Sequence, residues 1–288
     1  MKSRSLMSML ALSCGLVAFA AANAAPGGPE LKPFADADHV VYTPIRGAVA
    51  PKAVTLLTNH GGGVLTSAKV VFIFWGSSFA NAASPDHTYA TTLQAFRNQF
   101  GTTPEYNVIT QYSGILLSNL GSGTADWFDT SAPPTNVTDS TVHAEVNRYF
   151  SGGHGAFNNS TIYEVVLPSS SYSSSGSSTS CGGPHLAYCA YHGSYAGSSG
   201  TVKYSIQPYA SCSGCKVSGW SDVQNEEHFV CHETREAVTD PVNAWWDSTT
   251  GEEADDKCAW SPTPFIGTGG FAYQYEWSNA ARACVRTR

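Results

Sequence analysis

The chain has 288 residues and a formal net charge of −7, with 15 basic and 22 acidic side chains. Only 13% of its residues are charged, whereas it contains 27 glycines, 14 tyrosines and 7 tryptophans. This composition is typical of a folded, loop-rich protein and excludes an intrinsically disordered chain. The acidic balance also argues against a nucleic-acid partner, because phosphate binding requires a basic surface.

The amino terminus, over residues 1–24, has the pattern of a secretory signal peptide. Lys2 and Arg4 precede an apolar run over residues 6–22, and residues 22–24 read Ala-Asn-Ala, a small-residue cleavage pattern. A membrane anchor is the alternative, but the apolar run is shorter than the roughly 20 apolar residues of a membrane span, and no charged flank follows it. We therefore expect an extracellular or periplasmic protein without membrane contact. Loss of the two basic residues with the signal peptide changes the net charge from −7 to −9.

Two stretches of the mature chain are expected to be loosely ordered. Residues 25–58 carry proline and glycine with weak periodicity. Residues 169–180 are almost entirely serine, glycine and threonine, and they offer few apolar side chains to a core. The second stretch therefore predicts a mobile surface loop.

Apolar runs and helical spacing predict one domain over residues 59–288. Residues 68–76 and 160–168 are continuous apolar runs, as expected of strands buried on both faces. Residues 89–100 and 140–150 have helical spacing of their apolar side chains. Residues 186–195 and 201–209 have the pattern of two paired strands. The predicted fold class is α/β, with a mixed β-sheet covered by helices.

Seven of the eight cysteines follow the signal peptide, and an oxidising compartment should pair most of them. The sequence does not fix their connectivity. Residues 212–215 read Cys-Ser-Gly-Cys and predict a structural disulfide across a glycine turn, with a redox motif or half of a zinc site as alternatives. Cys231 lies within a charged helix and is predicted to be the unpaired thiol. The remaining candidates for disulfides are Cys181, Cys189, Cys212, Cys215, Cys258 and Cys284.

A late helix is marked at both ends. Residues 221–224, Ser-Asp-Val-Gln, fit a capping box, and Asp240-Pro241 should end the helix. At about 100° per residue, one side carries Val223, Val230 and Ala237. The opposite side carries His228, His232 and Glu236, so we expect one face to pack and the other to present ligands.

The string His-Glu-Thr-Arg-Glu over residues 232–236 indicates a metal-binding helix. His232 and Glu236 are spaced to bind one ion from adjacent turns, and Glu233 lies where a general base would reach water activated by the ion. His228, one turn upstream, is a less favoured ligand. The alternative is a charged helix face stabilised by pairs four residues apart, because H-E-x-x-E is a weaker pattern than H-E-x-x-H.

An acidic stretch about twenty residues after this helix offers a third ligand. It contains Glu252, Glu253, Asp255 and Asp256, and the separation is the one at which glutamate-type zinc peptidases supply that ligand. Calcium is an alternative cofactor for such a run, although no EF-hand spacing is present.

Three groups of motifs resemble the EXORDIUM, or phosphate-induced protein 1, family. HETREAVTDPVNAW, GEEADDKC and YQYEWSNAARACV resemble its carboxy-terminal half, which has H-E-x-x-E, a T-N-P or T-D-P turn, N-A-W and E-x-x-D-x-C. NHGGGVLTSAKVVFIFWG resembles its amino-terminal signature, and CAYHG its central motif. The likeness runs from about Asn59 to the end, and the signal peptide suggests a bacterial-type secreted relative.

The resemblance implies a secreted protein that associates with the cell wall. Plant members of the EXORDIUM family are cell-wall-associated and are linked to growth and hormone response. In the family's terms, Glu253 and Asp256 match the E-x-x-D-x-C positions. His60 and His192 lie in matched motifs and could line a site.

Two functions are therefore expected from different classes. The first is a zinc-dependent hydrolase, most readily a metallopeptidase. A zincin-like helix would provide His232 and Glu236 as ligands, and Glu253 or Asp256 would be the third ligand. Glu233 would be the general base. The second is a non-catalytic extracellular binding or signalling module that recognises a cell-wall glycan or a receptor. A peptide or a glycan is accordingly the expected partner.

Overall fold

The computed structural model describes residues 39–48 and 54–288. The predicted signal peptide lies outside the described residues, as do residues 25–38 and 49–53 of the amino-terminal segment. Across the described residues, none of the helices combines the length and the apolar character needed to cross a membrane.

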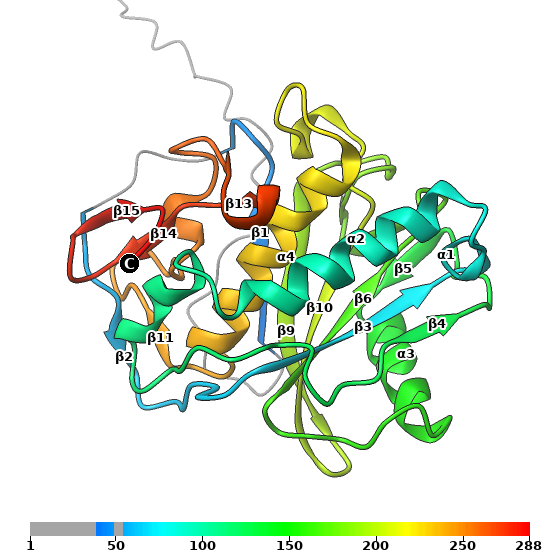
Figure 1. Cartoon of the computed structure of the whole chain (residues 1–288), viewed down its shortest axis with the longest axis horizontal. Coiled ribbons are helices and arrows are strands. Elements are labelled where there is room, and N and C mark those ends of the chain that lie inside the picture. The colour runs from blue at the N-terminus through cyan, green and yellow to red at the C-terminus, as the bar shows by residue number, and fades with distance from the viewer. Residues whose placement is uncertain (1–38, 49–53) are drawn as a thin grey trace, which may run out of the picture.

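A mixed six-stranded sheet forms the centre of the fold, in the order β1-β9-β10-β6-β3-β4 (Figure 1). The neighbours β10, β6, β3 and β4 are parallel, whereas β9 runs antiparallel to both β10 and β1. In chain order the strands are β1 (His39–Pro44), β3 (Lys69–Trp75), β4 (Trp127–Asp129), β6 (Thr161–Val166), β9 (Tyr188–Gly197) and β10 (Gly200–Gln207). The predicted mixed sheet is confirmed, and so are its two buried strands, β3 and β6.

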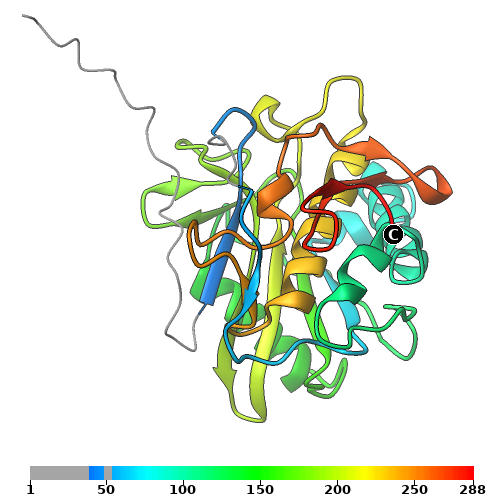
Figure 2. The ribbon, with the colours of Figure 1, turned by 90° about the vertical axis from the view of Figure 1, so that its left-hand side faces the viewer.

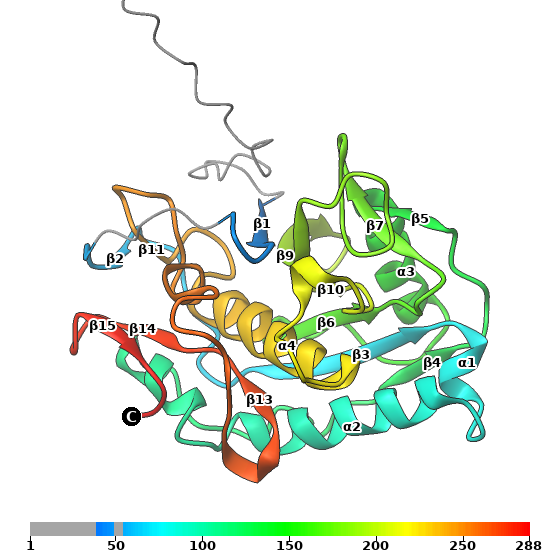
Figure 3. The ribbon, with the colours of Figure 1, turned by 90° about the horizontal axis from the view of Figure 1, so that it is seen from above.

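Helices cover both faces of this sheet. Figure 3 shows α2 (Pro85–Phe100) and α4 (Asp222–Thr239) on one side and α3 (Asp139–Ser151) on the other. The short α1 (Ser77–Ala80) follows β3 directly. Each face has its own apolar core, one beneath α2 and α4 and one beneath α3. The predicted helices at 89–100 and 140–150 are α2 and α3, and α2 begins earlier because Ser84 caps it and Pro85 occupies its first turn.

The ends of α4 are those that the sequence predicts. Ser221 and Gln224 form a reciprocal capping box, and the helix ends at Thr239, before Asp240 and Pro241. The expectation that only one face packs is wrong, because every residue from Asn225 to Thr239 is buried. The sheet and α2 pack on one side of α4, and the carboxy-terminal segments cover the rest, so its polar face is enclosed.

The prediction of a mobile loop over residues 169–180 is wrong. This stretch forms β7 (Tyr172–Ser175) and β8 (Ser178–Thr179), which make a small sheet with β5 (Asn136–Thr138). Ser173 and Ser180 are fully buried, with the Ser180 hydroxyl accepting from the Ser173 amide and the Ser173 hydroxyl bonded to Tyr188. Hydrogen bonds between small polar side chains and the backbone replace apolar packing here.

Most of the remaining short elements lie beside α4 on the side where β3 begins, which is the left-hand side of Figure 1 and faces the viewer in Figure 2. Three two-stranded sheets pair β2 (Thr58–Asn59) with β11 (Trp245–Trp246), β12 (Phe265–Ile266) with β13 (Ala272–Tyr273), and β14 (Glu276–Ser278) with β15 (Ala283–Val285). The 3-10 helices are η1 (Tyr106–Gln111), η2 (Ser213–Cys215), η3 (Asp256–Cys258) and η4 (Thr268–Gly270). The segment 25–58 was expected to be loosely ordered, but its described part contributes β1 to the main sheet and the first residue of β2 to a smaller one.

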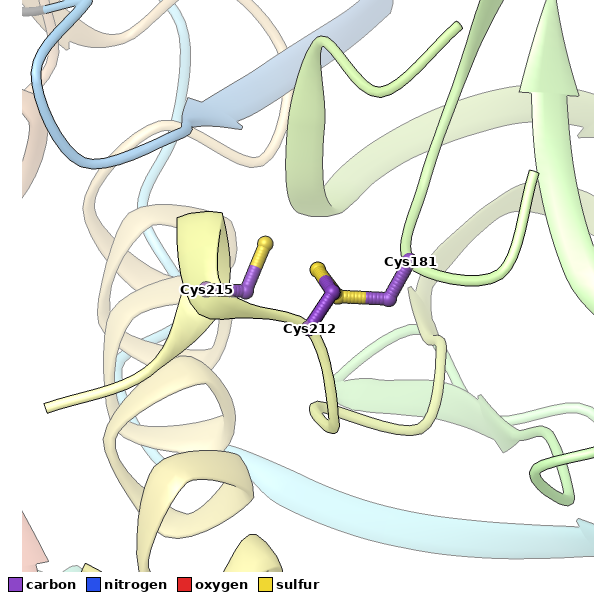
Figure 4. Close-up of side chains that lie close together, drawn as sticks. All are labelled: Cys181, Cys212 and Cys215. Carbon is purple, nitrogen blue, oxygen red and sulfur yellow. A yellow bond between two sulfur atoms is a disulfide. The ribbon is translucent and has the colours of Figure 1, made fainter. Parts of the chain in front are cut away.

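Among the described residues, three disulfides join Cys181 to Cys212, Cys189 to Cys215, and Cys258 to Cys284. The predicted disulfide within the Cys-Ser-Gly-Cys turn is therefore wrong, because its two cysteines have different partners. Figure 4 shows Cys212 bonded to Cys181, with the sulfur of Cys215 directed elsewhere. Cys231 is the free thiol, as predicted, and burial raises its pKa to about 12, so it is chemically inert.

The contact between α2 and α4 buries a carboxyl group. Glu226 is fully buried and accepts a hydrogen bond of 2.6 Å from the Tyr89 hydroxyl. Burial raises the pKa of Glu226 to about 8, against about 4.3 in an unfolded chain. Between these values the folded state holds a proton that the unfolded state has lost, so the free energy of unfolding decreases as pH rises.

Glu226→Gln should reduce this pH dependence. The amide keeps an acceptor for Tyr89 and removes the titration, so the fall in unfolding free energy between pH 5 and pH 8 should become shallower by up to about 1.4 kcal/mol per pH unit. Urea unfolding at four pH values measures this slope. Glu252→Gln, at the surface beside Thr250, is the control and should keep the parent slope. Equal slopes in the parent and Glu226→Gln would contradict the assignment.

Candidate metal centre

Six buried ionisable side chains converge between α4, β9 and the chain that leads into η3. We call them the polar cluster. None of them is more than 4% exposed. The cluster consists of His192 from β9, of His232, Glu233 and Glu236 from α4, and of Glu253 and Asp256 from the segment at η3. The predicted base, Glu233, and the four favoured ligand positions are therefore brought together. His192 lies beside them as the sixth member.

His232 and Glu236 lie one turn apart on α4 and point at the same place. The distance from His232 Nε2 to Glu236 Oε2 is 3.0 Å, so the two side chains form an ion pair when His232 is protonated. Gln274 Oε1 lies 3.1 Å from His232 Nδ1, which assigns a proton to Nδ1 and leaves Nε2 to carry either a second proton or a metal ion. Two ligand atoms that each lie about 2.0–2.1 Å from one tetrahedral ion are about 3.3 Å apart. The distance between His232 Nε2 and Glu236 Oε2 is close to this value, so the two atoms could bind the same ion.

Asp256 closes one side of this pair. Its Oδ1 lies 3.5 Å from His232 Nε2, and its backbone N–H donates to Glu236 Oε1 at 2.8 Å. The second contact fixes the orientation of the Glu236 carboxylate, as partners of metal-ligating carboxylates do. Glu236 is thereby held with its other oxygen, Oε2, directed at His232.

His192 closes the other side. Its Nδ1 lies 3.1 Å from Glu233 Oε2 and 3.6 Å from Glu236 Oε2, and its Nε2 lies 3.7 Å from Glu253 Oε1. Two groups of ligand atoms result, each with all members within 4.8 Å of one another: His192 with Glu236 and Glu253, and His232 with Glu233 and Glu236. These buried groups could hold a metal ion.

From its motif alone, His192 was expected only to line a site, whereas the structure places it at the centre. Its position depends on the packing of β9 against α4, which no local pattern reveals. The one sequence signal was its place in the CAYHG motif.

Glu233 is held by two elements outside α4. Thr43 Oγ1, from β1, donates a hydrogen bond to Glu233 Oε1, and the Nδ1–H of neutral His192 faces Oε2. Both carboxylate oxygens therefore have a donor. Thr43 has no motif around it, so the sequence did not identify it.

A buried ion-pair network supports the cluster from behind. Arg235 is fully buried, bonds to both carboxylate oxygens of Asp255 and lies 2.8 Å from Glu276 Oε2. Its Nη2 also donates to the Gln274 carbonyl. Arg235 thus holds the segment that carries Asp256 and the Gln274 side chain that orients His232.

Burial shifts the pKa values of the cluster strongly. It raises the pKa of Glu233 to about 8 and those of Glu236 and Glu253 well above their usual range, because desolvation penalises the charged form. Burial lowers the pKa of His192 to about 3, so its ring is neutral. Burial alone would also lower the pKa of His232, but Glu236 and Asp256 outweigh it and hold that pKa well above its usual value. A bound dication would favour the deprotonated form of each ligand.

Two predicted positions lie outside the cluster. His228 is buried between the rings of Phe229 and Trp260, and its pKa is lowered by burial to about 3, so it packs as an aromatic residue. His60 stacks on Trp246 with ring centroids 3.6 Å apart, near β2. The close trio Cys181, Cys212 and Cys215 (Figure 4) offers no thiolates, because all three sulfurs are in disulfides, that of Cys215 with Cys189.

Comparisons of the chain with protein-family models, with curated proteins and with solved structures find no match.

Substitution of His192 should weaken metal binding. His192→Gln keeps a polar side chain but removes the imidazole between Glu233 and Glu253, so the dissociation constant for Zn²⁺ should rise at least about tenfold. Competition with a chromophoric chelator measures it. The matched control is His60→Gln, which should bind as the parent does. Indistinguishable dissociation constants for the two variants would remove His192 from the centre.

Proposed function

We propose that this protein is a secreted metal-dependent hydrolase whose centre is the polar cluster. His232 and Glu236 are the principal ligands, with Asp256, Glu253 and His192 available to complete the set. The proposal depends chiefly on one observation: two fully buried ligand atoms, His232 Nε2 and Glu236 Oε2, lie 3.0 Å apart and point at the same place. A proton on His232 Nε2 offsets the cost of burying this pair, and a dication would offset it for Glu253 and Asp256 as well.

The donor set favours zinc over calcium. Two imidazoles and several carboxylates match the nitrogen and oxygen ligands of Zn²⁺, whereas Ca²⁺ takes six to eight oxygens. The neutral ring of His192 suits an ion that prefers imidazole, as does His232 Nε2 once a bound ion has displaced its proton.

Glu233 is the group best placed for proton transfer. It neighbours His232 on α4, and its carboxylate belongs to the same group of converging atoms as His232 and Glu236. A bound zinc-type ion would polarise a carbonyl and acidify water at this place. A pKa of about 8, raised by burial, allows Glu233 to accept a proton near neutral pH once a cation lowers that value. Because carboxylate ligands neutralise the dication, we expect slow hydrolysis, most readily of a peptide bond.

The cellular setting is inferred from two features. Three disulfides fit an oxidising compartment, and the sequence over 1–24 has the pattern of a signal peptide. The motifs shared with the EXORDIUM family support a place at the cell wall.

A second candidate function is a non-catalytic binding module in which the same residues form a structural metal site. The observation that favours it is the burial of the cluster, since no member is more than 4% exposed and Glu233 already has two donors. A closed site with an occupied base is typical of structural metal sites, which keep no open position.

Glu233 and Glu236 carry the same functional group about one helical turn apart. Replacing each of them by glutamine therefore distinguishes the two functions. In a hydrolase, Glu233→Gln removes a proton acceptor, so metal content should be nearly unchanged and hydrolysis of a peptide library should fall by about 10²-fold or more. Glu236→Gln removes a ligand, so both metal content and melting temperature should fall. Elemental analysis, thermal unfolding and peptide mass spectrometry measure these effects.

Equal metal content and equal melting curves in the two variants would remove Glu236 as a ligand and would contradict the hydrolase. Loss of metal in Glu236→Gln alone, without hydrolysis by the parent protein, would favour the binding module.

A further inference from the structure

The closed state of the polar cluster raises the question of how a substrate would reach it. Glu233 and Glu236 are fully buried, and a scissile carbonyl cannot approach them unless an enclosing element moves. The enclosing elements are α4, β9, the chain at η3, and β1.

Three of these elements are fixed in place. Cys189–Cys215 ties β9 to η2, and Cys258–Cys284 ties the η3 segment to β15. Arg235 holds the same segment through Asp255, and α4 is buried on all sides. Among the described residues, β1 contains no disulfide, lies at the edge of the main sheet, and pairs with β9 alone (Figure 2). Its other ties are hydrogen bonds, from Tyr42 to Ser175 and from Trp260 to the Pro44 carbonyl, so it can leave without breaking a covalent link.

The strand β1 also touches the reacting group. It runs antiparallel to β9 with Val41 opposite His192, and Thr43 donates its hydroxyl hydrogen bond to Glu233. Val41 and Thr43 are buried, whereas Tyr42 points to the other face and packs against the rings of Tyr188 and Tyr191. A peptide in the place of β1 would lie against the same two residues, His192 and Glu233.

We propose that β1 is an internal occupant of a peptide-binding edge, and that the substrate is an extended peptide which replaces it on β9. This inference rests on the proposed function. Departure of β1 would expose the backbone N–H and C=O groups of β9 to strand addition, a common mode of peptide recognition, and would free Glu233 from Thr43. The pairing of Val41, Tyr42 and Thr43 with β9 predicts the substrate sequence. The peptide should carry an aromatic residue in the place of Tyr42, between two β-branched residues in the places of Val41 and Thr43.

The chain following β1 offers a way to test this with the whole protein. Arg46 is exposed in a turn, where its amide donates to Gly214 and its guanidinium to Lys216. Limited trypsin treatment of the secreted protein should cut after Arg46 or Lys52, leaving β1 held only by non-covalent contacts. The control is the double variant Arg46→Gln/Lys52→Gln, which trypsin cannot cut there.

The experiment measures strand exchange. After trypsin is inhibited, each protein is incubated with a fluorescent peptide that has the sequence of residues 39–46, and bound peptide is measured by anisotropy. The cut protein should take up at least about tenfold more peptide than the control variant, and a scrambled peptide should not bind. Hydrogen exchange of the intact protein should also show the amides of Val40 to Thr43 exchanging faster than those of β10.

Equal uptake by the cut and control proteins, or no uptake by either, would overturn the inference, as would amide exchange in β1 as slow as in β10. Strand exchange does not require metal or hydrolysis, so it tests the inference separately from the proposed function. Uptake without any hydrolysis would support the peptide-binding edge and refute the hydrolase. Hydrolysis by the control variant at the rate of the cut protein would support the hydrolase and refute occupation of the edge by β1.

Discussion

Four carboxyl groups and two imidazoles are buried against one another where α4 meets β9. Burying them costs desolvation free energy, and the surrounding contacts act to offset it. Keeping one of these carboxyl groups ionised away from water costs several kcal/mol, and burial therefore raises the pKa values of Glu233, Glu236 and Glu253. The described contacts offset part of this cost, through the Asp256 amide on Glu236, the Thr43 hydroxyl on Glu233 and the two imidazoles. A bound dication would offset much more, because it interacts with several carboxylates at once.

The rigidity of the fold around this centre follows from the same constraint. The side chains converge only if three chain segments far apart in sequence stay in register. The parallel strands and α2 position α4 from one side, and Arg235 with the Cys258–Cys284 disulfide positions the η3 segment from the other. On β9, the Cys189–Cys215 disulfide performs the equivalent task for His192. The exception is β1, which contacts Glu233 without such a tie.

Local chemistry made much of this predictable from the sequence. Uninterrupted apolar runs identified β3 and β6, and the Ser221 capping box with Asp240-Pro241 bounded α4. What depended on tertiary contacts was missed. Buried serine hydroxyls turned the stretch around Ser173 into strands, and the pairing of Cys212 and Cys215 with distant partners could not be read from their spacing. Thr43 comes to the centre through strand pairing, which leaves no local signal, and the one signal for His192 was its place in the CAYHG motif.

The central claim is that an ion belongs between His232 and Glu236, and anomalous X-ray diffraction at the zinc edge tests it most directly. Crystals of the secreted protein, supplied with Zn²⁺, should show a peak about 2.0–2.2 Å from both His232 Nε2 and Glu236 Oε2, with Glu253, Asp256 or His192 completing the shell. Absence of a peak there, with His232 and Glu236 joined by a direct hydrogen bond, would contradict the account.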